Sequence, residues 1–141
     1  MSRIGGYVLV PLLALCRMSS AAESAVGQWG HEAERARALY VANCAACHAA
    51  DGTGHSGTFP PLKGSRVVTK DDAAKHIQVV LVGLRGAKVG GVLYAAPMPS
   101  FGASLNDAEI ADIINYERSS WGNHGRLVTA SEVAAQRGQS R

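Results

Sequence analysis

Two cysteines and a histidine lie within five residues of one another, in the segment Cys44-Ala45-Ala46-Cys47-His48. The spacing CxxCH is the attachment sequence of a c-type haem. Two thiols separated by two residues at the end of a helical turn can each add to one vinyl group at the same porphyrin edge. The next residue then places an imidazole beneath the iron. We therefore expect one covalently bound haem c, with its iron, and a chain that folds around it.

The cysteine pair is compatible with other kinds of site. A structural disulfide or a thioredoxin-like redox pair also uses CxxC. A redox pair normally follows a strand in a βαβ unit, whereas residues 32–44 are rich in Ala, Glu, Arg and Leu and predict a helix. A zinc site would draw on Cys44, Cys47, His48 and His55, whose spacing is not that of paired zinc ligands. The flanking sequence favours haem attachment.

An iron held by one histidine needs a second axial ligand, and Met or His is the usual choice in an electron carrier. Met1 and Met18 fall in an N-terminal leader, which leaves Met98. The prolines on both sides of Met98 restrict its backbone and would hold the sulfur in place. The alternatives are that Met98 only fills the core, and that the iron takes no second ligand or a histidine. The candidate histidines are His55, His76 and His124, each more typical of a solvent-facing or hydrogen-bonded residue.

Residues 1–22 have a basic start, an apolar run and a small-residue stretch, which is the order of a secretory signal peptide. Retention of this segment as a membrane anchor is the alternative. Residues 23–30 then form a linker. Without the leader and its two arginines, 12 Lys and Arg stand against 11 Asp and Glu, so the net charge is about +1. We expect a periplasmic protein that does not bind nucleic acid and meets a membrane only if the leader is retained.

The chain has 141 residues, 47% of them hydrophobic and 18% charged, which indicates one folded domain and excludes intrinsic disorder. Apolar residues at helical spacing predict a helix over residues 31–44, which the haem motif ends. A second helix is predicted over residues 71–84, with Thr69 or Asp71 as its cap.

The sequence predicts two more helices from their capping residues. Asn106 followed by Glu109 is a capping-box pattern that opens the third helix, which should end before Gly122. Thr129 followed by Glu132 repeats the pattern at a short last helix. Turns and loops separate these segments, and no stretch is rich in strand residues. The predicted class is all-α.

The motif near the start, the Pro-Met pair and the terminal helix together resemble class I cytochromes c over roughly residues 31–123, which leaves 124–141 as a C-terminal tail. The sequence is still more similar to small haem c domains of bacterial periplasmic electron-transfer chains, such as the cytochrome subunits of membrane-linked alcohol and aldehyde dehydrogenases. The stretches that match those domains are Tyr40–His48, Gly52–Gly57, Phe59–Ser65, Pro97–Phe101, Leu105–Ile110, Tyr116–Asn123 and, in the tail, Val128–Arg137.

The resemblance implies a class I cytochrome c fold, in which helices wrap around one covalent haem. It implies thioether bonds from Cys44 and Cys47, and axial ligation of the iron by His48 and Met98. The implied function is that of a one-electron carrier in a periplasmic or membrane-associated respiratory chain. A ligand-binding or peroxidatic haem protein and a non-haem dithiol oxidoreductase remain alternatives. None of these residues is expected to act as a catalytic group.

Further residues gain roles from the resemblance. It implies that the carbonyl of Pro60 accepts the second ring proton of His48, which orients the ring, and that Leu62 packs on the haem. Tyr94 and Trp121 are candidates for the haem propionate edge, with simple apolar packing as the alternative.

The first and third helices carry two further features. The resemblance implies that Tyr40 and Tyr116 meet where these helices cross. Glu117 departs from the pattern, because the related domains usually have an apolar residue at this position of the sequence Tyr-Ile-Arg-Ser.

The expected partners are redox proteins: a dehydrogenase, an oxidase or other cytochromes. Such partners would dock over the exposed haem edge. Because the net charge is small, docking should depend on apolar contact and on local basic residues. The candidates are Lys63, Arg66, Arg85 and Lys88, for which a solvated surface is the alternative.

Overall fold

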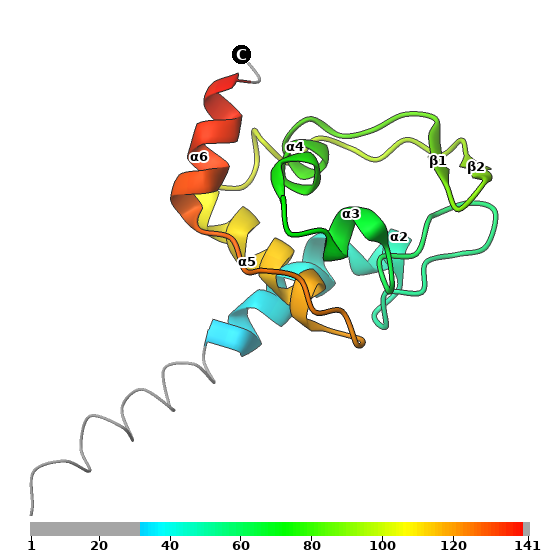
Figure 1. Ribbon diagram of the computed structural model, residues 1–141, viewed down its shortest axis with the longest axis horizontal. Helices are drawn as coiled ribbons and strands as arrows, with labels where there is room; N and C mark the ends of the chain where they lie inside the picture. The colour runs from blue at the N-terminus through cyan, green and yellow to red at the C-terminus, as the bar shows by residue number, and fades with distance from the viewer. Residues whose placement is uncertain (1–31, 140–141) are drawn as a thin grey trace, which may run out of the picture. The chain divides into compact units, whose positions relative to one another are not determined.

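A computed structural model describes residues 32–139 of the chain, and Figure 1 shows how they are arranged. The expected signal peptide and linker lie outside the described residues. The elements are a helix over residues 32–43, then α2 (Ala45–His48), α3 (Arg66–Thr69), α4 (Ala74–Val82), β1 (Ala87–Val89), β2 (Val92–Tyr94), α5 (Asp107–Ser119) and α6 (Ala130–Gln139). The predicted all-α class is confirmed, with one small hairpin added. None of the described helices is long and apolar enough to cross a membrane.

The hairpin lies in a segment that the sequence analysis treated as a loop. Val89 pairs with Val92 in the antiparallel register, so Gly90 and Gly91 alone connect the strands. Their φ angles are +57° and +87°, as a two-residue hairpin turn requires. The Gly-Gly pair was the available signal, but three-residue strands are too short to show an alternating pattern. In Figure 1 the hairpin and α6 lie at opposite sides of the view.

The second predicted helix begins later than expected and has a different cap. Neither Thr69 nor Asp71 caps α4. Ala73 occupies the N-cap position without a side-chain hydrogen bond, and Oδ1 of Asp72, one residue earlier, accepts a hydrogen bond of 3.0 Å from the backbone N–H of Ala74. Thr69 is already part of α3, a single helical turn that the sequence analysis did not predict.

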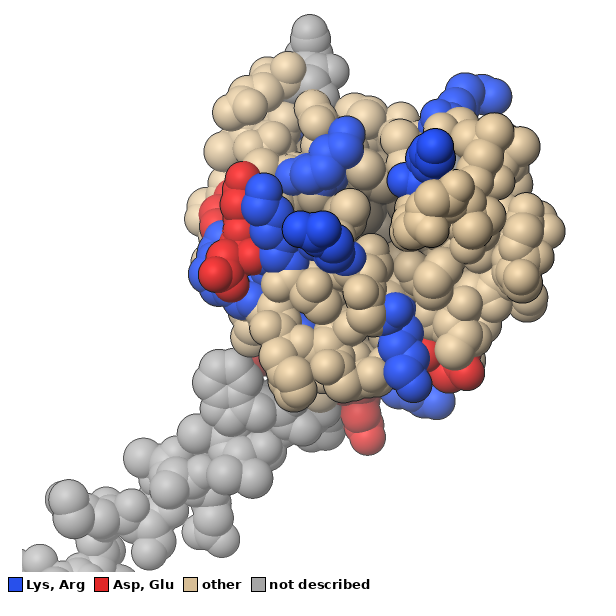
Figure 2. All heavy atoms as spheres, turned by 45° about the vertical axis from the view of Figure 1, so that its right-hand side comes forward, with Lys and Arg blue, Asp and Glu red and all other residues tan. Residues whose placement is uncertain are grey.

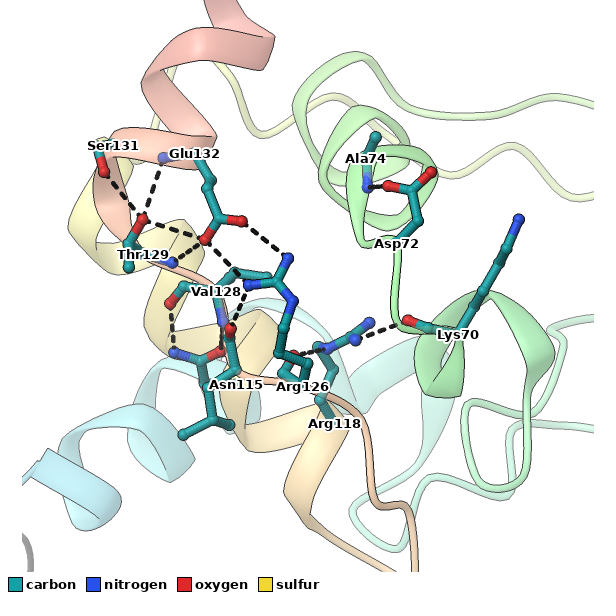
Figure 3. Close-up of polar contacts among 11 residues, drawn as sticks. Lys70, Asp72, Ala74, Asn115, Arg118, Arg126, Val128, Thr129, Ser131 and Glu132 are labelled. Atoms are coloured by element: carbon teal, nitrogen blue, oxygen red, sulfur yellow. Dashed lines mark hydrogen bonds and ion pairs between the residues drawn. The ribbon is translucent and has the colours of Figure 1, made fainter.

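The two predicted capping boxes are confirmed. The side chain of Asn106 accepts from the N–H of Glu109 at 3.0 Å, and Glu109 accepts from the N–H of Asn106 at 2.9 Å. At α6, Glu132 accepts from the N–H of Thr129 at 2.8 Å (Figure 3). Arg126 donates to Glu132 at 2.8 Å, and this bond, with those from Thr129, lowers the pKa of Glu132 to about 2. Local chemistry was sufficient to place both helix starts.

Two clusters of buried residues form the core. The larger one joins α4, α5 and α6, and includes residues of the C-terminal tail. Its buried members are Ala73, Ile77, Val80, Leu81, Ile110, Ala111, Ile114, Val128 and Val133. The smaller cluster holds Tyr40, Cys44 and Ile113, against which Tyr116 and Trp121 pack. The ring centroids of Tyr40 and Tyr116 are 5.1 Å apart, as expected where the first helix meets α5.

A buried arginine links α5 to two distant segments. Arg118 is fully buried and donates to three backbone carbonyls: those of Val68 at 2.7 Å, Lys70 at 2.7 Å and Arg126 at 2.5 Å. Figure 3 shows its guanidinium between the end of α3 and the segment that precedes α6. Burial lowers the pKa of Arg118 from its usual value. The guanidinium takes the place of water as the donor to these carbonyls.

Candidate haem site

The two cysteines and His48 are presented by the end of the first helix and by α2. The N–H of His48 donates to the carbonyl of Cys44 at 2.9 Å, which holds the motif in one helical turn. Both thiols are free; Cys44 is buried and Cys47 half-buried. Burial, with the negative charge of Glu117 as a second cause, raises the pKa of Cys44 well above its usual value. Ala49, with φ of +62°, then turns the chain out of the helix.

The ring of His48 is oriented by the loop that follows it. Its Nδ1 lies 2.9 Å from the carbonyl oxygen of Pro60, the bond that the resemblance implied. A carbonyl only accepts, so Nδ1 carries the proton and Nε2 keeps its lone pair free for a metal. The loop approaches closely at Gly54, where a Cβ would lie 2.7 Å from the same Pro60 oxygen. The position therefore requires glycine.

The backbone of Met98 is held by the residues that follow α4. Its N–H donates to the carbonyl of Leu84 at 2.8 Å, and its carbonyl accepts from the N–H of Leu84 at 3.1 Å. Gly83 makes this approach possible, since a Cβ there would lie 2.6 Å from the Met98 carbonyl oxygen. The side chain of Met98 is half-buried and packs against the larger core cluster.

One cavity joins these two segments. The space between its walls is about 1000 Å³ and includes a part that is open to solvent. Most of its wall is apolar. The predicted site residues that line it are Cys44, Cys47, His48, Pro60, Leu62, Tyr94 and Met98. Two thiols and an available imidazole nitrogen on one segment, with a thioether on another, match the donors that a covalent haem uses.

Trp121 is not among the residues that line the cavity. Its ring centroid lies 5.2 Å from that of Tyr40 and 5.5 Å from that of Tyr116. It also covers Gly52, whose missing side chain leaves room for the indole. Trp121 thus packs on the aromatic surface that the two tyrosines form at the helix crossing, which is the alternative given for it, and its place at the haem propionate edge stays a prediction.

The three alternative histidines differ in their surroundings. His55 and His124 are exposed, whereas His76 is 3% exposed and lines the cavity. Residues 32–139 contain no group of three or more His, Cys, Asp or Glu placed to hold a metal ion.

His76 belongs to a buried pair that the sequence analysis did not predict. Its Nε2 lies 2.7 Å from Oε2 of Glu117, and both residues line the cavity. Its Nδ1 is buried and has no hydrogen-bond partner in the described part of the chain. The two residues are 41 positions apart, so no local pattern connects them. The one signal was Glu117 itself, a charged residue at a position where related domains are apolar.

Asn123 connects the loop that contains Leu62 with the C-terminal part of α5. Its side chain donates to the carbonyls of Leu62 at 3.2 Å and Glu117 at 2.8 Å, and accepts from the N–H of Gly64 at 2.8 Å. This buried amide holds one wall of the cavity in place across about 60 residues of sequence.

The four expected basic residues are all exposed, and each adjoins in sequence a residue that lines the cavity. Lys63 follows Leu62, Arg66 follows Ser65, Arg85 follows Leu84, and Lys88 precedes Val89. Figure 2 shows Lys and Arg side chains around a hollow on the face that it presents, with most of the rest of that face uncharged.

Comparison with known proteins agrees with this site. The cytochrome c family model matches residues 33–121. The chain is 41% identical to the cytochrome c subunit of the quinone alcohol dehydrogenase of Gluconobacter oxydans, over 67% of this chain and 20% of that protein. It is 37% identical to the gluconate 2-dehydrogenase cytochrome c subunit of Pantoea cypripedii, over 77% of this chain and 25% of that protein. It is also 38% identical to cytochrome c-552 of Thermus thermophilus, over 68% of this chain and 79% of that protein.

The chain belongs to the cytochrome c family. It spans about a fifth to a quarter of the length of the two dehydrogenase subunits, and most of the length of cytochrome c-552. Membership implies a covalently bound haem c with its iron, and a role in electron transfer. The predictions of the family and of the fold class are confirmed.

Proposed function

We propose that this protein carries single electrons through one haem c that is attached to Cys44 and Cys47, with His48 and Met98 as the axial ligands. The observation that carries the proposal is the cavity, because the CxxCH segment and Met98 line it together although they are 50 residues apart. When bound, the haem supplies reversible one-electron oxidation and reduction of its iron.

The residues of the chain position and shield that site. Pro60 orients the imidazole of His48 and makes its Nε2 a better donor. Gly83 and Leu84 hold the Met98 backbone, so the thioether needs little further ordering. With both axial positions filled by side chains, no position is open to oxygen or peroxide, and the mostly apolar wall limits the access of water. This arrangement favours outer-sphere electron transfer over ligand binding or peroxidatic chemistry.

We further propose that the protein works in the periplasm, where a dehydrogenase donates its electrons. Two relatives are cytochrome c subunits of dehydrogenases, which supports this class of partner. The expected docking surface is the rim of the cavity with Lys63, Arg66, Arg85 and Lys88. Reversing these four charges should slow electron transfer with an acidic partner at low salt, where attraction between charges is least screened. Unchanged rates would remove the docking proposal.

The test of the proposal is an absorption spectrum of the full chain, produced with the c-type maturation machinery and recorded oxidised and dithionite-reduced. We expect the bands of a low-spin c-type haem and the weak far-red sulfur-to-iron band of the oxidised form. Met98→Ala should lose the far-red band. The matched control is Leu93→Ala, which removes an exposed hairpin side chain and should keep it.

Other results would identify the alternatives. A far-red band that survives Met98→Ala would contradict ligation by Met98. A high-spin haem that binds carbon monoxide would indicate a ligand-binding protein. A mature chain without covalent haem, with Cys44 and Cys47 as thiols or as a disulfide by intact mass, would indicate dithiol chemistry and overturn the proposal.

A further inference from the structure

The buried pair of His76 and Glu117 places a titratable site in the wall of the cofactor cavity. His76 lies on α4 and Glu117 on α5, and each is 3% exposed. Their side chains meet at 2.7 Å, and both line the cavity that also holds the CxxCH segment and Met98. Two ionisable groups with almost no access to bulk water need a reason to persist in an otherwise apolar wall, since an apolar pair of similar size is often at least as stable.

If Glu117 is ionised, its hydrogen bond with His76 leaves one ring nitrogen of His76 to exchange a proton. An ionised Glu117 only accepts, so Nε2 of His76 carries a proton and donates to it. His76 Nδ1 is buried and has no hydrogen-bond partner among residues 32–139, so none of these residues dictates its protonation. With Nδ1 bare the pair has a net charge of −1, and with Nδ1 protonated it has a net charge of zero. The pair can therefore bind or release one proton without losing its own hydrogen bond.

The surrounding elements supply no fixed cation that would decide this charge. On the side of the first helix, the Tyr40 hydroxyl and the Cys44 thiol interact electrostatically with Glu117, and both are neutral groups. From β2, Tyr94 lines the same cavity.

Basic residues close in sequence are turned elsewhere. Arg118 follows Glu117, but its guanidinium donates to backbone carbonyls at α3 and before α6. On α3, Arg66 and Lys70 are exposed, and so is Lys75 on α4. No Lys or Arg in the part of the chain that the structure describes forms an ion pair with Glu117. When the haem is bound, its charge therefore acts on a pair that no described Lys or Arg neutralises by an ion pair.

We propose that His76 and Glu117 form a proton-binding site that takes up one proton when the bound haem is reduced and releases it when the haem is oxidised. The inference rests on the proposed function. On reduction the iron gains one electron from the redox partner and passes from ferric to ferrous, and Nδ1 of His76 gains one proton from solvent. On oxidation the electron passes to a redox partner and the proton returns to solvent. The loss of one positive charge at the iron favours the neutral form of the pair, because the charges interact through a low dielectric.

The consequence is a reduction potential that depends on pH. Histidine changes charge in the range of about pH 5 to 8. At high pH the pair keeps its net charge of −1 in both redox states and stabilises the ferric haem, so the potential is lower. We expect the proton to bind about tenfold more tightly in the reduced protein. A tenfold change corresponds to about 59 mV for a one-electron couple, so the potential should fall by about that amount across the range.

The experiment is a potentiometric titration of the haem-loaded full chain from pH 5 to 9. Wild type is compared with His76→Gln, which keeps a donor to Glu117 but cannot take up a proton at this pH. The matched control is His124→Gln, the same substitution at an exposed histidine. A double variant, His76→Leu with Glu117→Leu, tests the site if the single variant does not fold. A low-spin haem spectrum shows that each variant is folded.

We expect the reduction potential to fall with rising pH in wild type and in His124→Gln. This fall should be absent in His76→Gln and in the double variant. As a second readout, the NMR signal of the His76 ring should show that the proton is bound more tightly in the reduced protein than in the oxidised one. The same fall in wild type and in the double variant would assign the proton to another group, such as Tyr94 or a carboxylate of the cofactor, and overturn the inference. Absence of any reversible one-electron couple in wild type would instead contradict the proposed function.

Discussion

Replacing Gly83 with alanine tests how closely the Met98 segment depends on the end of α4. Gly83 has φ of +79° and ψ of −176°, a region that only glycine enters freely. A side chain in such a region costs about 1 to 3 kcal/mol. Its Cβ would also lie 2.6 Å from the Met98 carbonyl oxygen and 3.0 Å from two atoms of the next peptide, all of them backbone. Moving that backbone costs about 1 to 3 kcal/mol more.

We therefore expect Gly83→Ala to lower the free energy of unfolding by about 2 to 6 kcal/mol. The matched control is Gly86→Ala, where φ is +65° and nothing lies within 4 Å of the added Cβ. In that variant the free energy of unfolding should fall only by the cost of an alanine in a left-handed conformation, about 1 to 2 kcal/mol. The difference between the two losses of stability reports the contact of residue 83 with the Met98 segment.

The assay is urea unfolding of the haem-loaded chain, followed by circular dichroism, together with the far-red band of the oxidised protein. The displaced Met98 backbone should weaken or remove this band in Gly83→Ala and leave it intact in Gly86→Ala. Equal losses of stability in the two variants, with equal far-red bands, would refute the reasoning that Gly83 positions Met98.

Three further substitutions probe contacts described above. Arg118→Met removes three hydrogen bonds of a buried cation, and urea unfolding should show that the free energy of unfolding falls by about 3 to 6 kcal/mol. The exposed Arg66→Met should lower it by about 0.5 kcal/mol or less. Similar losses in the two variants would contradict the role of the buried guanidinium. Because the folded-state pKa of Glu132 is lowered to about 2 from 4.5, its contribution is present above pH 4.5 and lost as the pH falls toward 2. Glu132→Gln should therefore flatten the fall in stability across that range, and an unchanged slope would assign it to other carboxylates. Arg137→Met removes bonds to two carbonyls of the segment between Met98 and α5 and the ion pair with Asp107, so thermal unfolding should begin at a lower temperature; an unchanged midpoint would show that α6 does not fasten this segment.

The parts of the site that were predictable are those that local chemistry determines. The CxxCH spacing is read within five residues, and Met98 was left as the candidate once the leader was set aside. The starts of α5 and α6 followed from Asn106 with Glu109 and Thr129 with Glu132, because a capping box closes within one turn.

What was missed depends on residues far apart in the chain. His76 was expected to be solvent-facing or satisfied, and its partner Glu117 comes from another helix. Arg118 gave no sign of burial, since its three acceptors lie in segments that only the folded chain brings to it. Trp121 packs on an aromatic surface that the first helix and α5 form together, a contact that no local pattern shows. Apolar periodicity does not show which polar groups will meet.

The burial of Cys44 has a consequence for the way in which the protein is made. Cys44 is 7% exposed, and its raised pKa keeps the thiol protonated, so in a folded chain it is a poor nucleophile that few reagents reach. Cys47 is more accessible, and an alkylating reagent added to the folded chain without haem should modify it first. Thioether formation at both cysteines thus requires a chain whose first helix has not yet packed against α5. We expect biosynthesis to follow one order, with attachment before folding, and a chain that folds too early to remain without its cofactor.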